Sequence, residues 1–164
     1  MSSADKNLSS YGSVELKNPE SYKISILVSE WNTQITEALY SGSLDTLIKH
    51  GFLKDNIEKI DVPGSFELSL GAQWQAQRAE IDAVICIGCV IQGDTKHFDF
   101  ICDATANGIM NVGLKYNKPV VFGVLTTNNI QQAFDRAGGK HGNKGDEAAI
   151  TAIKMLAIKN LNQH

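Results

Sequence analysis

Short apolar segments and longer amphipathic ones alternate along most of the 164-residue chain. The apolar segments are rich in β-branched residues, which is typical of strands buried on both faces of a parallel sheet. Four such strands are predicted, at residues 24–28, 57–62, 83–87 and 120–125. Apolar residues recur with helical spacing after each strand, at residues 33–50, 66–79, 97–112, 132–137 and 146–160. This alternation predicts one three-layer α/β/α domain around a four-stranded parallel sheet.

The N-terminal part of the chain lacks this pattern. Residues 1–20 are polar and rich in Ser and Asn, so a flexible N-terminal segment is expected before a single domain at residues 21–164. Val14 and Leu16 alternate with polar neighbours. They predict an extra N-terminal edge strand, one that could pair with another chain.

Composition narrows the class of protein. The net charge of -3 gives no electrostatic footprint for nucleic acid. No apolar run approaches the roughly 20 residues of a membrane span, and the N-terminus lacks the layout of a signal peptide. The three cysteines offer no disulfide framework, so a cytoplasmic protein is expected.

The segment after the third strand is the first candidate for chemistry. Residues 93–95 (Gly-Asp-Thr) form a predicted strand-to-helix turn. Free amides and the helix dipole at such a turn favour an anion, typically phosphate. His97 would lie in the first turn of the following helix, within reach of that anion. The pair indicates either acid–base chemistry on a phosphorylated small molecule or an ordinary helix start with a surface histidine.

Two other strand ends carry candidate site residues. Trp31 follows the first strand, where an aromatic either stacks on a planar ligand ring or packs as a hydrophobic plug, the commoner use. After the second strand, Ser65 is a predicted N-cap, with Phe66 and Glu67 in the first helical turn. Glu67 would either favour the helix dipole or accept hydrogen bonds from a polyol.

Three further motifs need weighing. Cys86 and Cys89 form a C-x-x-C motif inside an apolar strand, where residues three apart face opposite sides, so no redox or metal role is expected. Residues 88–95 resemble a nucleotide-triphosphate loop, but Asp94 replaces its lysine and would repel phosphate. The Gly-rich basic stretch 136–145 is either a solvated hinge or a phosphate-binding segment.

Taken together, five blocks resemble one enzyme family, 6,7-dimethyl-8-ribityllumazine synthase. The blocks are Glu-Trp-Asn at 30–32, Val-Pro-Gly-Ser-Phe-Glu at 62–67, residues 88–100, Phe-Gly-Val-Leu-Thr-Thr at 122–127 and residues 136–145. The resemblance implies a flavodoxin-like fold and the penultimate step of riboflavin biosynthesis. In that step 5-amino-6-ribitylaminouracil condenses with 3,4-dihydroxy-2-butanone 4-phosphate, and no cofactor is required.

The resemblance also implies a role for each matching residue. His97 matches the catalytic histidine, and Trp31 matches an aromatic that stacks on the pyrimidine. Further residues would contact the pyrimidine or the ribityl chain: Asn32, Ser65, Phe66, Glu67, Val90, Ile91, Phe122 and Lys144. The phosphate would be held by Gly93, Asp94, Thr95 and Arg136. No metal ligand is implied.

Assembly follows from the same resemblance. Phe122, Arg136 and Lys144 would complete the site of a neighbouring subunit in a homopentamer, with Phe122 expected near the carboxyl edge of the fourth strand. The short 137–145 segment favours pentamers that close into an icosahedral shell, and riboflavin synthase is a candidate partner. Neither nucleic acid nor membrane is an expected partner.

The sequence departs from the usual family residues at three positions, where Trp31 replaces a frequent phenylalanine, Gln92 an arginine and Asn128 a glutamate. A flavin mononucleotide-binding module of flavodoxin type is the alternative interpretation. It is disfavoured because the phosphate loop of flavodoxins follows the first strand.

Overall fold

Four parallel strands form the central sheet of the computed structural model, which describes residues 16–161. They are β1 (Ile24–Ser29), β2 (Ile57–Val62), β3 (Ala83–Ile91) and β4 (Val120–Thr127), in the order β2-β1-β3-β4. The helices are α1 (Thr33–Lys49), α2 (Leu68–Gln77), α3 (His97–Tyr116), α4 (Ile130–Phe134) and α5 (Lys144–Leu161). A short antiparallel hairpin, β5 (Ala137–Gly139) with β6 (Gly142–Asn143), joins α4 to α5. Two 3-10 turns, Pro19–Ser21 and Lys54–Asn56, precede β1 and β2.

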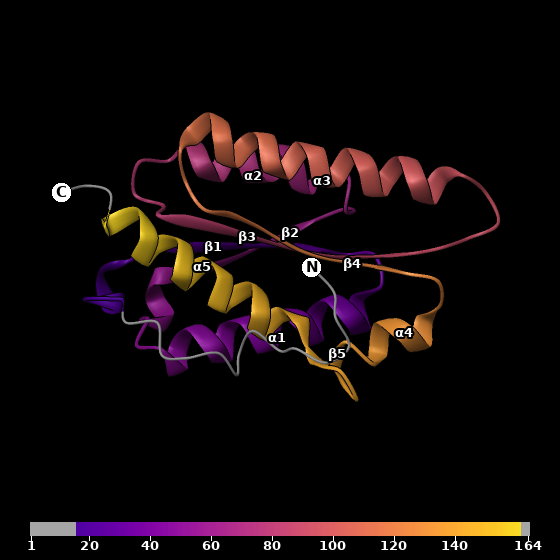
Figure 1. Cartoon of the computed structure of the whole chain (residues 1–164), viewed down its shortest axis with the longest axis horizontal. Coiled ribbons are helices and arrows are strands. Elements are labelled where there is room, and N and C mark those ends of the chain that lie inside the picture. The colour runs from indigo at the N-terminus through magenta and orange to yellow at the C-terminus, as the bar shows by residue number, and fades with distance from the viewer. Residues whose placement is uncertain (1–15, 162–164) are drawn as a thin grey trace.

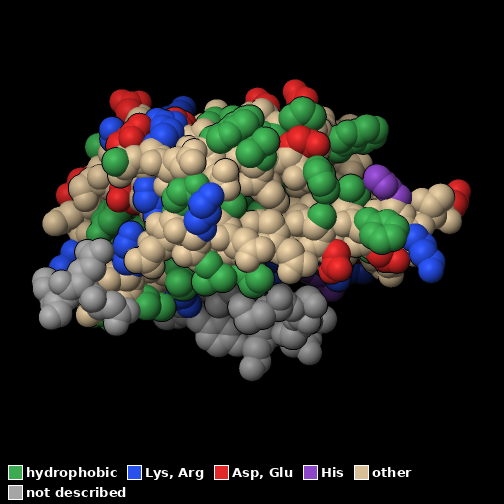
Figure 2. Space-filling model, turned by 90° about the horizontal axis from the view of Figure 1, so that it is seen from above, with side chains coloured by type: hydrophobic (Ala, Val, Ile, Leu, Met, Phe, Trp, Pro, Cys, Tyr) green, Lys and Arg blue, Asp and Glu red, His purple; other side chains and the backbone are tan. Residues whose placement is uncertain are grey.

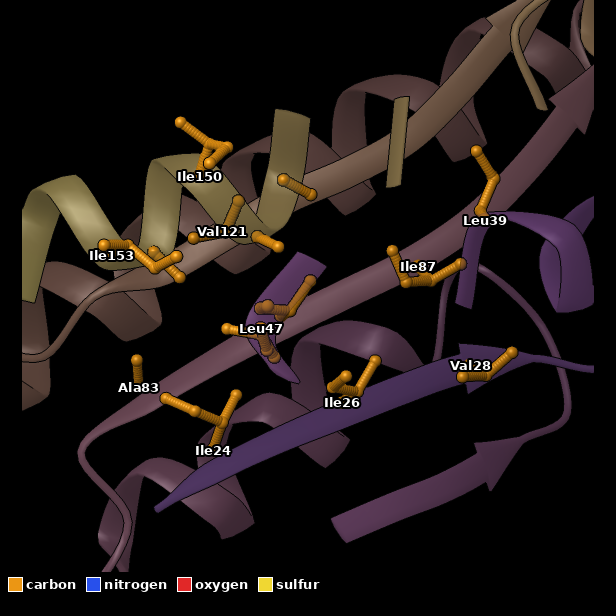
Figure 3. Close-up of a cluster of buried hydrophobic side chains, with 14 of the residues drawn as sticks. Ile24, Ile26, Val28, Leu39, Leu47, Ala83, Ile87, Val121, Ile150 and Ile153 are labelled. Atoms are coloured by element: carbon orange, nitrogen blue, oxygen red, sulfur yellow. The ribbon is translucent and has the colours of Figure 1, made fainter. Parts of the chain in front are cut away.

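The helices cover both faces of the sheet, with α2 and α3 on one side and α1 and α5 on the other (Figure 1). Alternate residues of each strand therefore enter two separate apolar clusters. In β1, Ile26 belongs to the cluster under α1 and α5, whereas Leu27 belongs to the cluster under α2 and α3. Figure 3 shows the first cluster, where side chains of β1 and β3 meet Leu39 and Leu47 of α1 and Ile153 of α5. The three-layer α/β/α prediction is confirmed.

Glycine allows α1 and α5 to approach closely. A Cβ on Gly145 would overlap the backbone carbonyl of Leu39, so no larger residue fits without a shift. Polar bonds fix the contact, because Ser43 Oγ donates to the carbonyl of Gly145 at 2.7 Å and Asn143 Nδ2 donates to that of Ala38 at 2.8 Å. These bonds bring the start of α5 against the middle of α1.

The ends of two strands and the start of one helix differ from the predicted ones. Strand β3 continues to Ile91 and β4 to Thr127, because their ends pair with each other in register. Helix α1 ends as expected, since Gly51 adopts φ 90 directly after the C-cap His50. Helix α2 starts later than predicted, and Glu67 rather than Ser65 occupies its N-cap position. The predicted N-cap Ser65 is therefore wrong, and Phe66 and Glu67 belong to the turn before the helix.

Residues 132–137 were predicted as a helix, followed by a Gly-rich stretch that was either a solvated hinge or a phosphate-binding segment. The helix end and the hinge alternative are wrong, whereas the phosphate-binding alternative stays a prediction. Helix α4 stops at Phe134, and the glycine-rich stretch forms the β5–β6 hairpin. Gly138 and Gly142 take φ of 111 and 71, values that favour glycine, which explains the composition of the turn. Helix α5 then begins at Lys144, two residues earlier than predicted.

The predicted N-terminal segment lies mostly outside the described residues, as does Val14. Leu16 is described, is only 9% exposed and joins the cluster under α1 and α5. It belongs to no strand within this chain, and the edge strand stays a prediction.

Candidate functional site

The carboxyl end of β1 presents an exposed tryptophan. Trp31 is 72% exposed, so it does not pack as a plug within its own chain, and the plug interpretation is wrong for the isolated subunit. Asn32 follows it in the left-handed region at φ 60 and donates from Nδ2 to the carbonyl of Cys89 at 2.9 Å. This bond joins the end of β1 to β3, and it leaves Oδ1 of Asn32 as the remaining side-chain polar atom.

The turn after β2 lies beside Trp31. Gly64 lies between the two features, since an added Cβ there would meet Glu67 Oε2 at 3.0 Å and Trp31 Cδ1 at 3.3 Å. Phe66 and Glu67 are exposed, whereas Ser65 is buried. Thr105 of α3 donates to the carbonyl of Ser65 at 3.2 Å and anchors the turn. The ends of β1 and β2 thus present an aromatic ring and a carboxylate side by side.

The end of β3 leads into an open turn. Val90 and Ile91 pair with Thr126 and Thr127, and their side chains are half-buried. The next residue, Gln92, donates its backbone N–H to the carbonyl of Thr127 at 2.8 Å. This bond uses only the backbone of Gln92, so it extends the pairing of β3 with β4 by one residue whatever the side chain at position 92.

Residues 93–96 then run exposed to the start of α3. An added Cβ on Gly93 would find no atom within 4 Å, so the space beside this turn is open within the chain. His97 is the first residue of α3 and is exposed, and its backbone N–H donates to Thr95 Oγ1 at 3.3 Å. The predicted strand–turn–helix arrangement is confirmed, and the turn at the helix start is open to solvent.

The basic residues Arg136 and Lys144 lie next to each other. The backbone N–H of Lys144 donates to the carbonyl of Arg136 at 2.8 Å, across the β5–β6 hairpin. Arg136 donates from Nη1 to the carbonyl of Gln132 at 3.0 Å, and Lys144 Nζ is paired with Glu147. Both cationic groups are half-buried and held by their own chain. Glu147, which sequence reasoning missed, is the carboxylate that fixes Lys144, and its i,i+3 spacing from Lys144 was the available signal.

Phe122 does not lie at this edge, and the expectation that it does is wrong. It pairs with Cys86 in the middle of the sheet, five residues before the end of β4. At about 3.3 Å per residue, this places it roughly 16 Å from the strand ends. Phe122 is 43% exposed on the edge strand β4. It therefore cannot line the site formed by Trp31 and His97 of its own chain.

Three buried hydroxyls lie at or near the carboxyl ends of strands. Ser29, Ser65 and Thr127 each have a buried side-chain oxygen with no hydrogen-bond partner among the described residues. Buried hydroxyls normally find a partner, so this edge has unused hydrogen-bonding capacity. Of the three, only Ser65 was singled out from the sequence, because Ser29 and Thr127 sit within apolar strands.

The two cysteines of the C-x-x-C motif have the geometry predicted for them. Cys86 belongs to the cluster under α2 and α3, and Cys89 to the opposite cluster, so the two thiols face opposite sides of the sheet. Burial raises the pKa of both, that of Cys89 to about 11, which keeps them protonated at neutral pH. Within residues 16–161, no group of three or more His, Cys, Asp or Glu side chains could hold a metal ion. The helices in that part of the chain are too short or too polar to cross a membrane.

Open parallel sheets bind ligands outside the carboxyl ends of their strands, where Trp31, Glu67 and His97 are found. The fold and this edge define a flavodoxin-like α/β protein with a candidate small-molecule site.

Comparison with known proteins identifies the family. Residues 21–160 match the family model of 6,7-dimethyl-8-ribityllumazine synthase. The chain is 68% identical to the enzyme of that name from Cytophaga hutchinsonii over 157 residues, which cover 96% of this chain and 98% of the relative. It is 51% identical to the one from Parabacteroides distasonis, over 95% of this chain and 98% of the relative. The corresponding protein of Flavobacterium johnsoniae is 50% identical, over 97% and 84%.

The chain belongs to the 6,7-dimethyl-8-ribityllumazine synthase family, whose members are transferases of riboflavin biosynthesis. The resemblance drawn from the five sequence blocks is thereby confirmed, and the flavodoxin alternative is set aside.

Proposed function

We propose that the carboxyl edge of the sheet condenses 5-amino-6-ribitylaminouracil with 3,4-dihydroxy-2-butanone 4-phosphate. One observation carries the proposal. The ends of three adjacent strands, β2, β1 and β3, bring a carboxylate, an exposed indole ring and an open turn before His97 to the same sheet edge. A ring-stacking surface beside an anion turn suits two substrates of which one is a planar pyrimidine and the other a phosphate ester.

The pyrimidine and its ribityl chain would bind over the ends of β1 and β2. Trp31 offers a large exposed face for stacking, and Glu67 is an acceptor for the hydroxyl groups of the ribityl chain. Asn32 contributes Oδ1, and Ser65, whose hydroxyl is buried, would support the turn that borders the ribityl chain. Phe66, Val90 and Ile91 would border the ring.

The phosphate would bind at residues 93–95, where an open turn and the start of a 20-residue helix favour an anion. Arg136 would add a guanidinium group, whose planar fork matches phosphate oxygens. Asp94 lies in the same turn and its side chain must point away from the phosphate, since two anions repel.

The condensation mainly requires that the two substrates are positioned for reaction and that protons are transferred. The 5-amino group attacks the ketone and an imine forms with loss of one water. Phosphate then leaves, and ring closure releases a second water. Holding two substrates in reacting geometry is worth about 7–11 kcal/mol, the larger share of the catalysis. His97 would move protons during these steps, because imidazole titrates near neutral pH. The phosphate-binding groups would stabilise the leaving group.

The site would be completed by a neighbouring subunit in a homopentamer. Phe122 lies too far from its own strand ends to contribute there, yet it is exposed on the edge strand. We place it, with Arg136 and Lys144, in the site of the adjacent subunit. The outer face of α2 and α3 supports association, because five large apolar side chains are exposed on it: Leu70, Trp74, Phe100, Met110 and Leu114. Figure 2, which views this side of the molecule, shows hydrophobic side chains at several places on its surface.

The hairpin at 137–143 is short, and we favour closure of pentamers into an icosahedral shell for that reason. The three free thiols suit a reducing cytoplasm.

The test is direct. The two substrates are mixed with the purified protein, and formation of the lumazine is followed by its absorbance and fluorescence. A rate above the uncatalysed condensation is expected. A rate equal to the uncatalysed one would refute the proposed function.

A further inference from the structure

The backbone conformation at residue 64 does not require a glycine. Gly64 is buried in the turn between β2 and α2, and its φ lies outside the left-handed region. Its carbonyl accepts the N–H of Glu67 at 3.2 Å, a bond that any residue could make. The reason for a glycine at this position therefore lies in the space beside its Cα atom.

That space is bordered by two side chains of the candidate site. An added Cβ would lie 3.0 Å from Glu67 Oε2, 3.3 Å from Trp31 Cδ1 and 3.9 Å from Trp31 Nε1. The first two distances are shorter than the roughly 3.5–4.0 Å at which non-bonded carbon atoms prefer to lie. The nearest atoms are all side-chain atoms, and both side chains are exposed and free to turn. A methyl group at this position would thus move Trp31 and Glu67 and leave the fold intact.

We propose that Gly64 is a specificity-determining position, which sets the gap between the indole ring of Trp31 and the carboxylate of Glu67. The inference rests on the proposed function and deepens it. A ligand whose planar ring lies on Trp31 and whose hydroxyl groups reach Glu67 needs both groups at fixed relative positions. Gly64 itself contacts neither the reacting atoms nor the phosphate turn, so it acts through its two neighbours.

The experiment compares Gly64→Ala with a matched variant, Gly113→Ala. Gly113 lies sixteen residues into α3, and an added Cβ there would make only ordinary contacts, the nearest with the carbonyl of Lys118 at 3.4 Å. In Gly64→Ala the KM for the ribityl pyrimidine should rise about 3- to 10-fold, since displacements well below 1 Å cost less than the roughly 100-fold of a full ångström. The kcat, the KM for the butanone phosphate and the melting temperature should stay close to wild type. Gly113→Ala should leave both KM values unchanged.

A double-mutant cycle tests whether Gly64 acts through Trp31. In a Trp31→Ala background, calorimetry should find that Gly64→Ala weakens binding of the ribityl pyrimidine less than it does in the wild-type background, because the displaced ring is absent and only the shift of Glu67 remains. The inference would be overturned by an unchanged KM in Gly64→Ala, or by a loss of the same size in the Trp31→Ala and wild-type backgrounds. An equal rise in both KM values with a lowered melting temperature would also overturn it. Failure of the proposed function would look different, because the wild-type protein itself would then form no product. In that case both the proposed function and the role of Gly64 would be refuted.

Discussion

At the scale of single residues, His97 stands out because it is exposed at the start of α3, next to an open turn. We expect His97→Ala to slow turnover by about 10- to 1,000-fold, at or below the usual contribution of general acid–base catalysis. Much of the rate would survive, because positioning of the substrates does not depend on the imidazole. Steady-state assays at saturating substrates measure this effect. Turnover equal to wild type would remove the catalytic role of His97.

Arg136 should have a different effect. Its guanidinium group bonds only to a backbone carbonyl of its own chain among the contacts described, which leaves donors for a phosphate. We expect Arg136→Ala to raise the KM for the butanone phosphate by about 10-fold or more, the loss of one charge-assisted hydrogen-bonded pair. Calorimetry with the ribityl pyrimidine should show near-normal affinity. If that affinity falls instead, Arg136 serves the pyrimidine side of the site.

The sequence locates the candidate site residues at strand ends better than it describes their surroundings. His97, Thr95 and Glu67 were found because each follows a strand end, and strand ends are visible as breaks in an apolar pattern. The exposure of Trp31 was not predictable, since it depends on which side chains from other segments cover the ring. Ser65 was mistaken for an N-cap because a serine before a helix is usually one. In this chain its hydroxyl is buried and the helix starts three residues later.

At the scale of elements, the contact between α1 and α5 depends on Gly145. A Cβ at this position would overlap the carbonyl group of Leu39, a backbone group that cannot rotate away. Gly145→Ala should therefore destabilise the fold by about 1–3 kcal/mol, the usual cost of overpacking, or by more. Urea unfolding at a fixed protein concentration measures the change, with Gly113→Ala as the control. Equal midpoints for the two variants would show that the helices separate without cost.

The elements themselves were predictable where they were long and periodic. The four strands and the long helices α1, α3 and α5 have clear patterns, and each was placed to within a few residues. The hairpin was missed because β5 and β6 have three and two residues, too few to show a period. The ends of β3 and β4 were also missed, since they are extended only by pairing with each other.

At the scale of the whole molecule, the proposed sharing of sites between subunits can be tested by complementation. If His97 and Arg136 of one site come from different subunits, a mixed assembly of His97→Ala and Arg136→Ala chains contains some intact sites. With equal, random incorporation, about one quarter of the sites should have both native residues. Co-expression with two different tags and tandem purification provides the mixed assembly. The assay uses a butanone phosphate concentration well below the KM of Arg136→Ala, where both separate variants are slow. Activity no higher than that of the separate variants would then mean that each chain supplies both residues to the same site.

The overall architecture could be predicted, but the order of its strands could not. Alternating strands and helices imply a parallel sheet with helices on both faces. Nothing in the pattern indicates that β1 lies between β2 and β3, which is what brings Trp31 beside the turn of Glu67. Phe122 was misplaced for a related reason, because its distance from the sheet edge depends on the register of β4 against β3.

The two tryptophans of this chain are both exposed, Trp31 by 72% and Trp74 by 58%, and they lie on different surfaces. Indole emission shifts in wavelength when water is excluded from the ring, so the wild-type spectrum adds two separate signals. Trp31 would respond to a ligand stacked at the sheet edge, and Trp74 to burial of the face of α2 and α3. Substituting one indole by phenylalanine would leave a single optical reporter, of ligand occupancy in Trp74→Phe and of subunit association in Trp31→Phe. The chain thus carries two built-in fluorophores with which substrate binding and assembly can be timed independently.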